Sequence, residues 1–436
     1  MNNEVSLVLQ VKNGRFLKDG KPFFYLADTC WSAFTNITAS DWNYYLDFRK
    51  IQGFNAIQIN ILQQWDASSC SQQLYPFDVT FKDDGSYIFD YSKINESYFD
   101  HACPMLHEMQ KRNMIPVLAL LWSNYVPDTW AAKIAKNNLF PAEFLENYVT
   151  YAVKRFKKYE PIYFVSGDTD FPTSNTIAYY RTVLDVLKKN DSQALRSFHI
   201  KGRLEEIPEE FSEASDFFSY QSGHNSAGQS TAYTIPFSKR RAGLTKPIVN
   251  TEPCYEQISY SRNQYGRYSQ KDVRQAVFSS VLSGADAGVT YGAHGIWSWH
   301  HAGADFGLSI GEGFDTPFDW HDALHFPGAS DLQIVKKVIE KYFPMASTPL
   351  DLSTPKTTKI RAAFYKNNCL IYLPTNTALD LSSLNVNRNN SKIFAFDLEK
   401  RIPLSVNWAA TSQLQLLSCL SDALIIVNKL GGFNHG

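Results

Sequence analysis

The sequence predicts a (β/α)8 barrel followed by a small antiparallel β-sandwich. Eight short apolar runs alternate with longer amphipathic segments, which is the pattern of parallel strands and their covering helices. Several of these runs end in acidic or amide residues, as barrel strands do when the active site lies at their carboxyl ends. After residue 347 short alternating strands are separated by Asn, Ser, Asp and Pro. We therefore expect a barrel over residues 1–345 and a sandwich over residues 346–436.

The first elements of the chain are a hairpin, a barrel strand and a helix. Residues 5–17 alternate weakly and meet the turn Lys18-Asp19-Gly20-Lys21, which predicts a β-hairpin across the closed end of the barrel. The run 22–30 (PFFYLADTC) is the first predicted barrel strand. Thr38 or Ser40 can cap the helix that follows, because both carry a hydroxyl that accepts a hydrogen bond from a free backbone N–H.

The second barrel strand, 54–62 (FNAIQINIL), has two chemically distinct sides. Its isoleucines alternate with Gln58 and Asn60, so the isoleucines are expected to face the helices while the amides point into the barrel. The segment 63–91 that follows is long for a strand-to-helix connection. We expect it to be a loop that shapes a substrate pocket.

The same alternation of strand and helix continues to residue 342. The third to eighth strands are expected at 114–122, 163–170, 197–202, 216–224, 247–255 and 287–297. Helices are expected at 98–112, 141–159, 175–189, 270–283 and 330–342, where apolar residues recur at helical spacing. The sandwich strands are expected at 360–365, 369–374, 392–397, 413–418 and 423–428. Eight strand–helix units is the number that closes a barrel.

Two acidic residues stand at predicted strand ends. In the seventh strand (PIVNTEPCY) the alternation brings Glu252 to the carboxyl end, directly before Pro253 stops the strand. In the fourth strand (YFVSGDTD) Asp168 has the same place, and Gly167 lets the backbone pass closely beside it. A pair of carboxyl groups is the minimum that glycoside hydrolysis needs, one as the proton donor and one as the nucleophile or base. Asp170 is an alternative acid that lies past the strand end.

Further residues near the strand ends are expected to bind the substrate. Polar side chains would hold sugar hydroxyls and aromatic side chains would form the walls. The residues expected to bind hydroxyls are Asp28, Gln58, Asn60, Gln221 and His224, and the expected walls are Trp31, Trp122, Tyr291 and Trp297. His294 is expected to contact a sugar hydroxyl or to tune a carboxylate. Arg49 and Arg274 lie on predicted helices and are expected to be structural.

The composition restricts the class of partner. The formal net charge is -1 and the pI is about 6.8, so no long-range field favours nucleic acid or an anionic membrane. A neutral small-molecule or oligosaccharide substrate fits better. The sequence has no apolar run of the length that spans a bilayer, and its first residues lack a basic segment followed by a long apolar one, so we expect a cytoplasmic protein. The six cysteines form no metal-binding spacing, and we expect no metal ion or cofactor.

Two other functions compete with this interpretation. In a metal-dependent barrel hydrolase, His199, His224 and His294 would serve as ligands, but the first strand ends in Asp-Thr-Cys where such barrels usually need His-x-His. The second alternative is a carbohydrate-binding protein without catalysis. Such a protein has little reason to keep both acids with Asn250, Tyr255 and Tyr291 around them.

The chain also resembles a known family. The stretches GKPFFYLADTCWSAF, VSGDTDFP, YQSGHN, VNTEPCYE and VRQAVFSSVLSGADAGVTYGAHGIW are similar to the apiosidase-like glycoside hydrolases, the group that contains glycoside hydrolase family 140. The resemblance extends from about residue 12 to residue 342. It implies a (β/α)8 barrel in which Asp168 is the general acid/base and Glu252 the nucleophile of a retaining, exo-acting glycosidase. The family activity is the release of apiose from a plant pectin side chain. Other pentosides are equally compatible with the resemblance as substrates.

The C-terminal segment resembles the β-sandwich that is often appended to this family and labelled as collagen-binding. Its stretch FAFDLEK departs from the usual aromatic-Phe-Asp-Pro-Arg pattern. We therefore favour a structural lid packed on the barrel over a ligand-binding module.

Overall fold

Eight parallel strands form the central sheet of the computed structural model, which describes residues 9–83, 87–135, 138–262, 264–307, 313–352 and 359–433. Their order in the sheet is β10-β9-β8-β5-β4-β15-β12-β11. The strands are β4 (Tyr25–Thr29), β5 (Ala56–Asn60), β8 (Ile115–Ala119), β9 (Ile162–Phe164), β10 (Arg196–Ser197), β11 (Phe218–Gln221), β12 (Ile248–Glu252) and β15 (Gly288–Tyr291). Six of them lie wholly within their predicted runs, β9 begins one residue before its run, and β10 shares only Ser197 with its run. The eight-stranded barrel is confirmed. Ser197 links the two end strands, because its hydroxyl donates to the Phe217 carbonyl.

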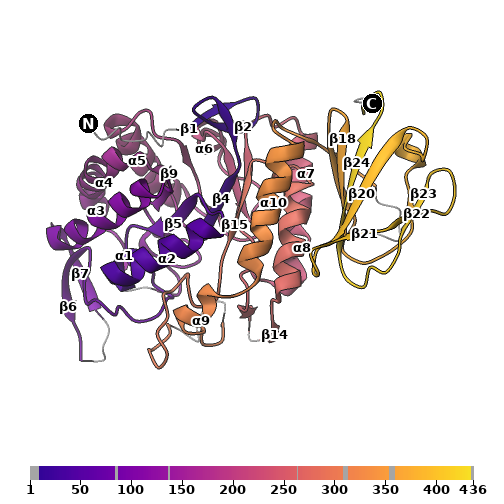
Figure 1. The fold of residues 1–436 in the computed structure, drawn as a ribbon. Coiled ribbons are helices and arrows are strands. Elements are labelled where there is room, and N and C mark those ends of the chain that lie inside the picture. Colours follow the sequence, from indigo (N-terminus) through magenta and orange to yellow (C-terminus); the bar gives the residue numbers. More distant parts are fainter. Residues whose placement is uncertain are drawn as a thin grey trace, which may run out of the picture.

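Helices cover the outside of the sheet (Figure 1). They are α1 (Ala33–Asn36), α2 (Ala39–Ile51), α3 (Glu96–Lys111), α4 (Ala142–Phe156), α5 (Ser174–Asn190), α6 (Glu209–Ala214), α7 (Thr231–Arg241), α8 (Gln270–Val281), α9 (Trp320–Leu324) and α10 (Gly328–Tyr342). Thr38 caps α2 by accepting the Asp41 N–H, as the sequence predicted. The helix α7 was not predicted. It contains Pro236, a residue that usually ends a helix.

A small antiparallel sheet closes the amino-terminal end of the barrel. It consists of β1 (Leu9–Lys12), β2 (Arg15–Lys18) and β3 (Lys21–Phe23), and the predicted turn at Asp19 and Gly20 joins the last two strands with φ of 52° and 73°. Arg15 on β2 donates hydrogen bonds to the Phe343 and Met345 carbonyls at the end of α10. Residues 5–8 of the predicted hairpin lie outside the described residues. Figure 1 shows this sheet at the end of the barrel opposite to α9 and β14 (Gln264–Arg267), which pairs with β13 (Ser259–Tyr260).

The connection after β5 is not a continuous loop, which corrects the expectation for residues 63–91. It contains a hairpin of β6 (Phe77–Phe81) and β7 (Tyr87–Ile94). Rings of this hairpin pack on the α4 region, with Phe77 5.6 Å and Tyr91 4.3 Å from Phe140 between ring centroids. Apolar residues alternate along both strands, and this period of two indicates a hairpin. The first part of the connection, near Gln64, remains irregular and faces the carboxyl ends of the strands.

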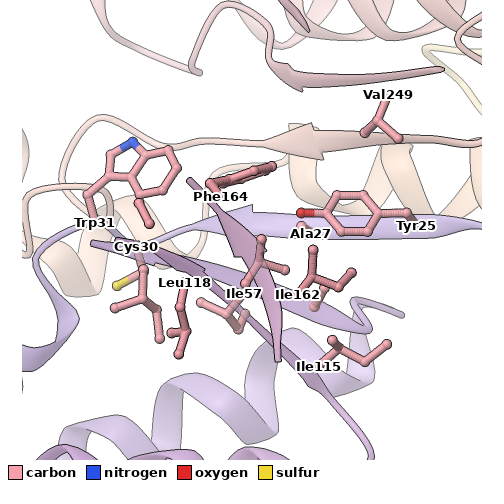
Figure 2. Close-up of a cluster of buried hydrophobic side chains, with 14 of the residues drawn as sticks. Tyr25, Ala27, Cys30, Trp31, Ile57, Ile115, Leu118, Ile162, Phe164 and Val249 are labelled. Carbon is pink, nitrogen blue, oxygen red and sulfur yellow. The ribbon is translucent and has the colours of Figure 1, made fainter. Parts of the chain in front are cut away.

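The barrel core is built from buried side chains of neighbouring strands, among them Tyr25, Phe164 and Val249 (Figure 2). Gln58 lies inside this core. Its Nε2 donates to the Thr251 carbonyl at 3.0 Å and its Oε1 accepts the Tyr25 hydroxyl at 2.9 Å. The amide does point into the barrel, but its hydrogen bonds hold strands together.

The C-terminal region is a β-sandwich, as predicted. Its larger sheet has the order β16-β17-β18-β24-β20-β21 and its smaller sheet the order β19-β23-β22. The strands are β16 (Thr348–Leu350), β17 (Arg361–Tyr365), β18 (Asn368–Leu373), β19 (Leu379–Asp380), β20 (Ser391–Asp397), β21 (Ile402–Leu404), β22 (Val406–Trp408), β23 (Gln413–Leu416) and β24 (Ala423–Lys429).

The central strands of the larger sheet, β18 and β24, are buried on both faces. Leu370 and Tyr372 belong to the barrel core, whereas their neighbour Ile371 belongs to the core between the two sheets. Tyr372 stacks on Phe278 of α8 with ring centroids 5.1 Å apart, and Figure 1 shows the sandwich beside α7, α8 and α10. Burial on both faces explains why β18 and β24 are nearly continuous apolar runs, whereas alternating strands were expected. The sandwich lies against the side of the barrel, so it is not a lid over the strand ends.

Among the described residues, none of the helices has the length and apolar character required to cross a lipid bilayer.

Candidate active site

A pocket opens at the carboxyl ends of the barrel strands, and seven of the predicted site residues line it. They are Asp168 and Glu252 together with Trp31, Trp122, Gln221, His224 and Trp297. Eleven further residues line the same pocket: Gln64, Asp66, Trp130, Lys201, Gly202, Arg203, Gly223, Asn225, Tyr255, Ile258 and Phe314. The pocket therefore brings together both predicted carboxyl groups and three of the predicted aromatic walls.

Glu252 is the last residue of β12 and lines the pocket with only 6% of its surface exposed. Its Oε1 accepts a hydrogen bond from Gln221 Nε2 at 2.6 Å and lies 3.0 Å from His224 Nε2. Its Oε2 lies 3.3 Å from His199 Nε2. Three polar side chains from the fifth and sixth strand ends therefore surround one carboxylate.

Backbone hydrogen bonds fix the tautomers of the two histidines. The Asp168 N–H donates to His199 Nδ1 at 3.0 Å, and the Tyr255 N–H donates to His224 Nδ1 at 3.4 Å. Because each Nδ1 is an acceptor, each neutral ring carries its proton on Nε2. Both Nε2–H groups face Glu252, so the histidines stabilise its ionised form.

These contacts decide the charge of Glu252. Burial alone would raise the pKa of this carboxyl, but the N–H groups of His199 and His224 outweigh burial and lower the pKa to about 2. Glu252 is therefore ionised at neutral pH. An ionised carboxylate can act as a nucleophile or a base but cannot donate a proton.

Asp168 follows β9 in a tight turn of the backbone. Its φ is 46°, in the left-handed region that aspartate tolerates better than most residues, and its carbonyl accepts the Trp130 Nε1–H at 2.7 Å. The glycine before it allows a close approach, because a Cβ on Gly167 would lie 2.0 Å from the Trp122 ring. The predicted need for a small residue beside the acid is confirmed, and its cause is the Trp122 wall.

Hydrogen bonds also orient the aromatic walls. Trp31 Nε1 donates to the Tyr255 hydroxyl at 3.1 Å, and the Trp31 and Trp122 rings meet edge to face at 4.8 Å between centroids. Trp297 Nε1 donates to His294 Nδ1 at 3.1 Å. Trp130, which the sequence analysis missed, lies eight residues beyond the third strand's predicted end and has no periodic signal. The backbone N–H of Trp130 donates a hydrogen bond to Asp170 Oδ1 at 3.0 Å.

Asp28 does not line the pocket, which corrects its expected role. Its Oδ2 lies 2.6 Å from Arg49 Nε and accepts the Tyr45 hydroxyl at 2.7 Å, and the carboxyl is fully buried. Arg49 and Tyr45 belong to α2. Because Tyr25 on the same strand points into the barrel, the residue three positions later faces the helices. Arg49 is structural, as predicted.

Four other expected substrate residues also lie outside the pocket lining. Tyr291 donates to Glu256 Oε2 at 2.6 Å, and Asn60 donates to Gln64 Oε1 at 3.0 Å. His294 faces the Asp315 carbonyl at 2.7 Å, and burial lowers its pKa to about 3. Gln58 lies in the barrel core, as described above. Asn60 and His294 bond to the pocket-lining residues Gln64 and Trp297, whereas the partner of Tyr291 lies outside the lining.

The three histidines of the metal-hydrolase alternative do not converge on one point. His199 and His224 both face Glu252, whereas His294 is bonded to Trp297 and Asp315. No group of three or more His, Cys, Asp or Glu side chains suited to a metal ion occurs in the described part of the chain.

Comparison with known proteins places this geometry in a family. The model of the apiosidase-like catalytic domain matches residues 11–346. A solved glycoside hydrolase shares 18% identity, with 97% of each chain covered and a TM-score of 0.74. A glycoside hydrolase family 5 protein from Bacteroides vulgatus shares 20% identity over 97% of this chain and 92% of its own, with a TM-score of 0.77. A family 5 mannosidase from Rhizomucor miehei shares 12% identity over 77% of this chain and 99% of its own, with a TM-score of 0.54. Among curated proteins, none matches the sequence.

Proposed function

The chain belongs to the family of apiosidase-like catalytic domains and is a glycoside hydrolase, and on this premise we propose that it is a retaining, exo-acting enzyme. It removes a terminal apiose or another pentose-like sugar from a plant-derived oligosaccharide or a small glycoside. Glu252 is the nucleophile and Asp168 the general acid/base.

The reaction proceeds in two displacements. In the first, a Glu252 carboxylate oxygen attacks the anomeric carbon, and the bond from that carbon to the leaving oxygen breaks as Asp168 gives its proton to that oxygen. In the second, Asp168 takes a proton from a water molecule, and the water oxygen attacks the anomeric carbon and releases Glu252. The sugar leaves with its original anomeric configuration, and both carboxyl groups return to their starting state.

The observation that carries this proposal is the environment of Glu252. Hydrogen bonds from Gln221 and His224 hold a buried carboxylate in its ionised form inside a pocket that Asp168 also lines. A carboxylate without such donors would gain a proton when buried and lose its nucleophilicity.

The choice of a small sugar rests on two features of the pocket. Aspartate is one carbon shorter than the glutamate that many barrel glycosidases use as the acid, so the leaving oxygen must approach the strand ends closely. The tryptophans that line the pocket offer stacking surfaces for a sugar ring. Both features favour a compact sugar held deep in the pocket.

A leaving-group series tests the assignment of the two acids. Aryl pentosides and hexosides of both anomers would be screened first, each as a 4-nitrophenyl and a 2,4-dinitrophenyl glycoside. Glu252→Gln should lose at least 1,000-fold in kcat on every active substrate, since the nucleophile is absent. Asp168→Ala should lose far less on the 2,4-dinitrophenyl glycoside, because that leaving group needs no proton, and azide should restore its turnover.

Glu205→Gln is the matched control, because it removes an exposed carboxylate outside the pocket lining. NMR of the first-formed sugar should show retained configuration. An inverted product, or a Glu252→Gln variant with the wild-type rate, would rule out the proposed mechanism.

A further inference from the structure

A third carboxyl group, that of Asp66, lines the pocket together with Glu252 and Asp168. It comes from the irregular segment after β5, and the two-displacement reaction gives it no role. Its side chain is partly buried. The question is what a carboxylate beside the reacting sugar can do.

A chain of amides fixes the orientation of Asp66. The Leu62 N–H donates to Asn60 Oδ1 at 3.1 Å, Asn60 Nδ2 donates to Gln64 Oε1 at 3.0 Å, and Gln64 Nε2 donates to Asp66 Oδ1 at 2.7 Å. Each amide uses its oxygen as an acceptor and its NH2 as a donor, so the direction of the chain is set from the backbone outward. Asp66 Oδ1 is therefore an acceptor in a defined position.

The backbone around Asp66 is also held in place. The Gly307 N–H donates to the Ala67 carbonyl at 3.0 Å, and the Ser69 N–H donates to the Asp305 carbonyl at 2.9 Å. A Cβ on Gly307 would lie 2.8 Å from the Ala67 carbonyl, so the two segments touch closely. A side chain on such a backbone keeps its geometry when a ligand enters.

The second oxygen of this carboxyl is still available for a ligand. Among the described residues, Gln64 is the one side chain that donates a hydrogen bond to Asp66, and it does so to Oδ1; no Lys, Arg or His side chain lies within ion-pair distance of Asp66. Burial raises the pKa of Asp66 to about 6, and the nearby charge of Glu252 raises it further, whereas Gln64 and His224 act against the rise. A carboxylate that lacks enough donors binds groups that supply them, and sugar hydroxyls are such groups.

We propose that Asp66 is a substrate-binding residue that accepts hydrogen bonds from the hydroxyl groups of the sugar held between Glu252 and Asp168. The amide chain and the neighbouring segment at residues 305–307 preset its position. The inference rests on the proposed function for the identity of the ligand as a sugar. It assigns Asp66 to recognition of that sugar and leaves proton transfer to Asp168.

The test compares Asp66→Asn with Asp305→Asn. Both remove one carboxylate from the same pair of contacting segments, but Asp305 is exposed and is not part of the pocket lining. On the most active aryl glycoside of the screen, Asp66→Asn should lower kcat/KM by about 10- to 100-fold, mainly through KM, as expected for a hydrogen bond to a charged acceptor. The loss should be equal for the 4-nitrophenyl and 2,4-dinitrophenyl leaving groups. Asp305→Asn should stay within twofold of the wild type.

Two results would overturn the inference while leaving the proposed function intact. A loss confined to the 4-nitrophenyl substrate would make Asp66 a proton donor. An Asp66→Asn variant no weaker than Asp305→Asn would give it no role in substrate binding. If the wild type turns over no glycoside, the proposed function fails, and binding alone then decides the role of Asp66.

Binding is measured with the tryptophan fluorescence of the pocket. D-xylose, L-arabinose, D-mannose and D-galactose are titrated into the wild type and both variants, and a Kd raised at least fivefold only in Asp66→Asn supports the inference. Equal Kd values, or no binding by the wild type, overturn it. Thermal melts of both variants establish that each is folded.

Discussion

At the scale of single residues, the pocket sets the pKa values of two carboxyl groups in opposite directions. Both groups are desolvated, but Glu252 faces the N–H groups of two histidines, which lower its pKa to about 2, whereas Asp66 has one side-chain donor, the amide of Gln64, and a pKa of about 6. The number and charge of the neighbouring donors therefore decide which of the two carboxyl groups has the lower pKa. The ionised Glu252 in turn raises the pKa of Asp66, so the two groups influence each other.

The raised pKa of Asp66 predicts that this residue lowers stability at neutral pH. Its folded-state pKa of about 6 lies above the usual 3.8, so the folded protein binds the proton more tightly, and the penalty grows as the pH rises from about 3.8 to about 6 and is fully present above that range. Replacing Asp66 with Asn should therefore increase the free energy of unfolding by roughly 1–3 kcal/mol at pH 8 and by less than half of that at pH 4.5. Chemical denaturation at the two pH values measures the difference.

Asp305→Asn is the control for this stability measurement, because its exposed carboxylate should give the same small change at both pH values. A gain from Asp66→Asn that does not depend on pH would contradict the explanation. A variant that is more stable but binds the substrate more weakly would show a trade-off between stability and function at Asp66.

Sequence position identified some of the pocket residues and could not identify others. Glu252 and His224 were found because they follow strand ends, and strand ends converge in a barrel. Asp28 also lies at a strand end, but alternation alone does not say which face of a strand points into the barrel. The ion pair with Arg49 on α2 shows that Asp28 faces the helices. Asp66 lies in a segment without periodicity. Its place depends on contacts with residues 305–307, more than two hundred positions away.

At the scale of elements, three strand ends are connected through one imidazole. His199 follows β10, accepts the backbone N–H of Asp168 after β9, and faces Glu252 at the end of β12. The positions of the two carboxyl groups to which we assign the reaction are thus coupled by a rigid ring and not by the loops alone. This arrangement explains why the close approach at Gly167 matters, since that backbone also carries Asp168.

Replacing Gly167 with Ala should disturb this coupling. The new Cβ would lie 2.0 Å from the Trp122 ring, and the backbone cannot move freely because the Gly167 carbonyl accepts the Ser123 N–H at 2.9 Å. We expect a loss of about 1–3 kcal/mol in the free energy of unfolding and at least a tenfold lower kcat/KM. Steady-state kinetics and denaturant unfolding provide the two values.

The double variant Gly167→Ala with Trp122→Ala separates the two effects. Removing the ring removes the collision, so stability should recover relative to the sum of the two single changes. Activity should not recover, because Trp122 lines the pocket. A Gly167→Ala variant that retains the wild-type activity and stability would show that the Trp122 wall can move.

The repeating elements of the barrel were predictable, and the irregular ones were not. Each of the eight strands overlaps its predicted run, although β10 does so only at Ser197, because short buried strands separated by amphipathic helices leave a clear pattern. The hairpin of β6 and β7 lies in the 63–91 connection, where only a loop was expected. The helix α7 was not expected because Pro236 suggests a break. For α7, packing against the barrel outweighs the proline, whereas the hairpin carries a local signal, the alternation of apolar residues along β6 and β7.

At the scale of the whole molecule, a buried charge network joins the sandwich to the barrel. Arg274 on α8 lies 2.7 Å from Asp331 on α10 and donates two hydrogen bonds to Asp422, at 2.8 and 2.7 Å, just before β24 of the sandwich. Arg401 of the sandwich also reaches Asp331, at 3.0 Å. Together with the apolar packing around Tyr372, these contacts make the two parts share one interface. None of the described sandwich residues lines the pocket, so we expect any effect of these residues on activity to be indirect.

Replacing Arg274 with Met should weaken this interface without changing the pocket. The substitution leaves Asp331 and Asp422 buried with too few positive partners, and breaking a buried pair in this way costs about 3–5 kcal/mol. We expect calorimetry to show a lower melting temperature and a transition that separates into two, while kcat/KM at 25 °C stays within twofold of the wild type. Arg401→Met is the matched control, because the Arg401 side chain is 45% exposed and its pair with Asp331 should contribute less than about 1 kcal/mol. If the two variants melt alike, the buried network does not hold the sandwich to the barrel, and the apolar face around Tyr372 must supply that stability alone.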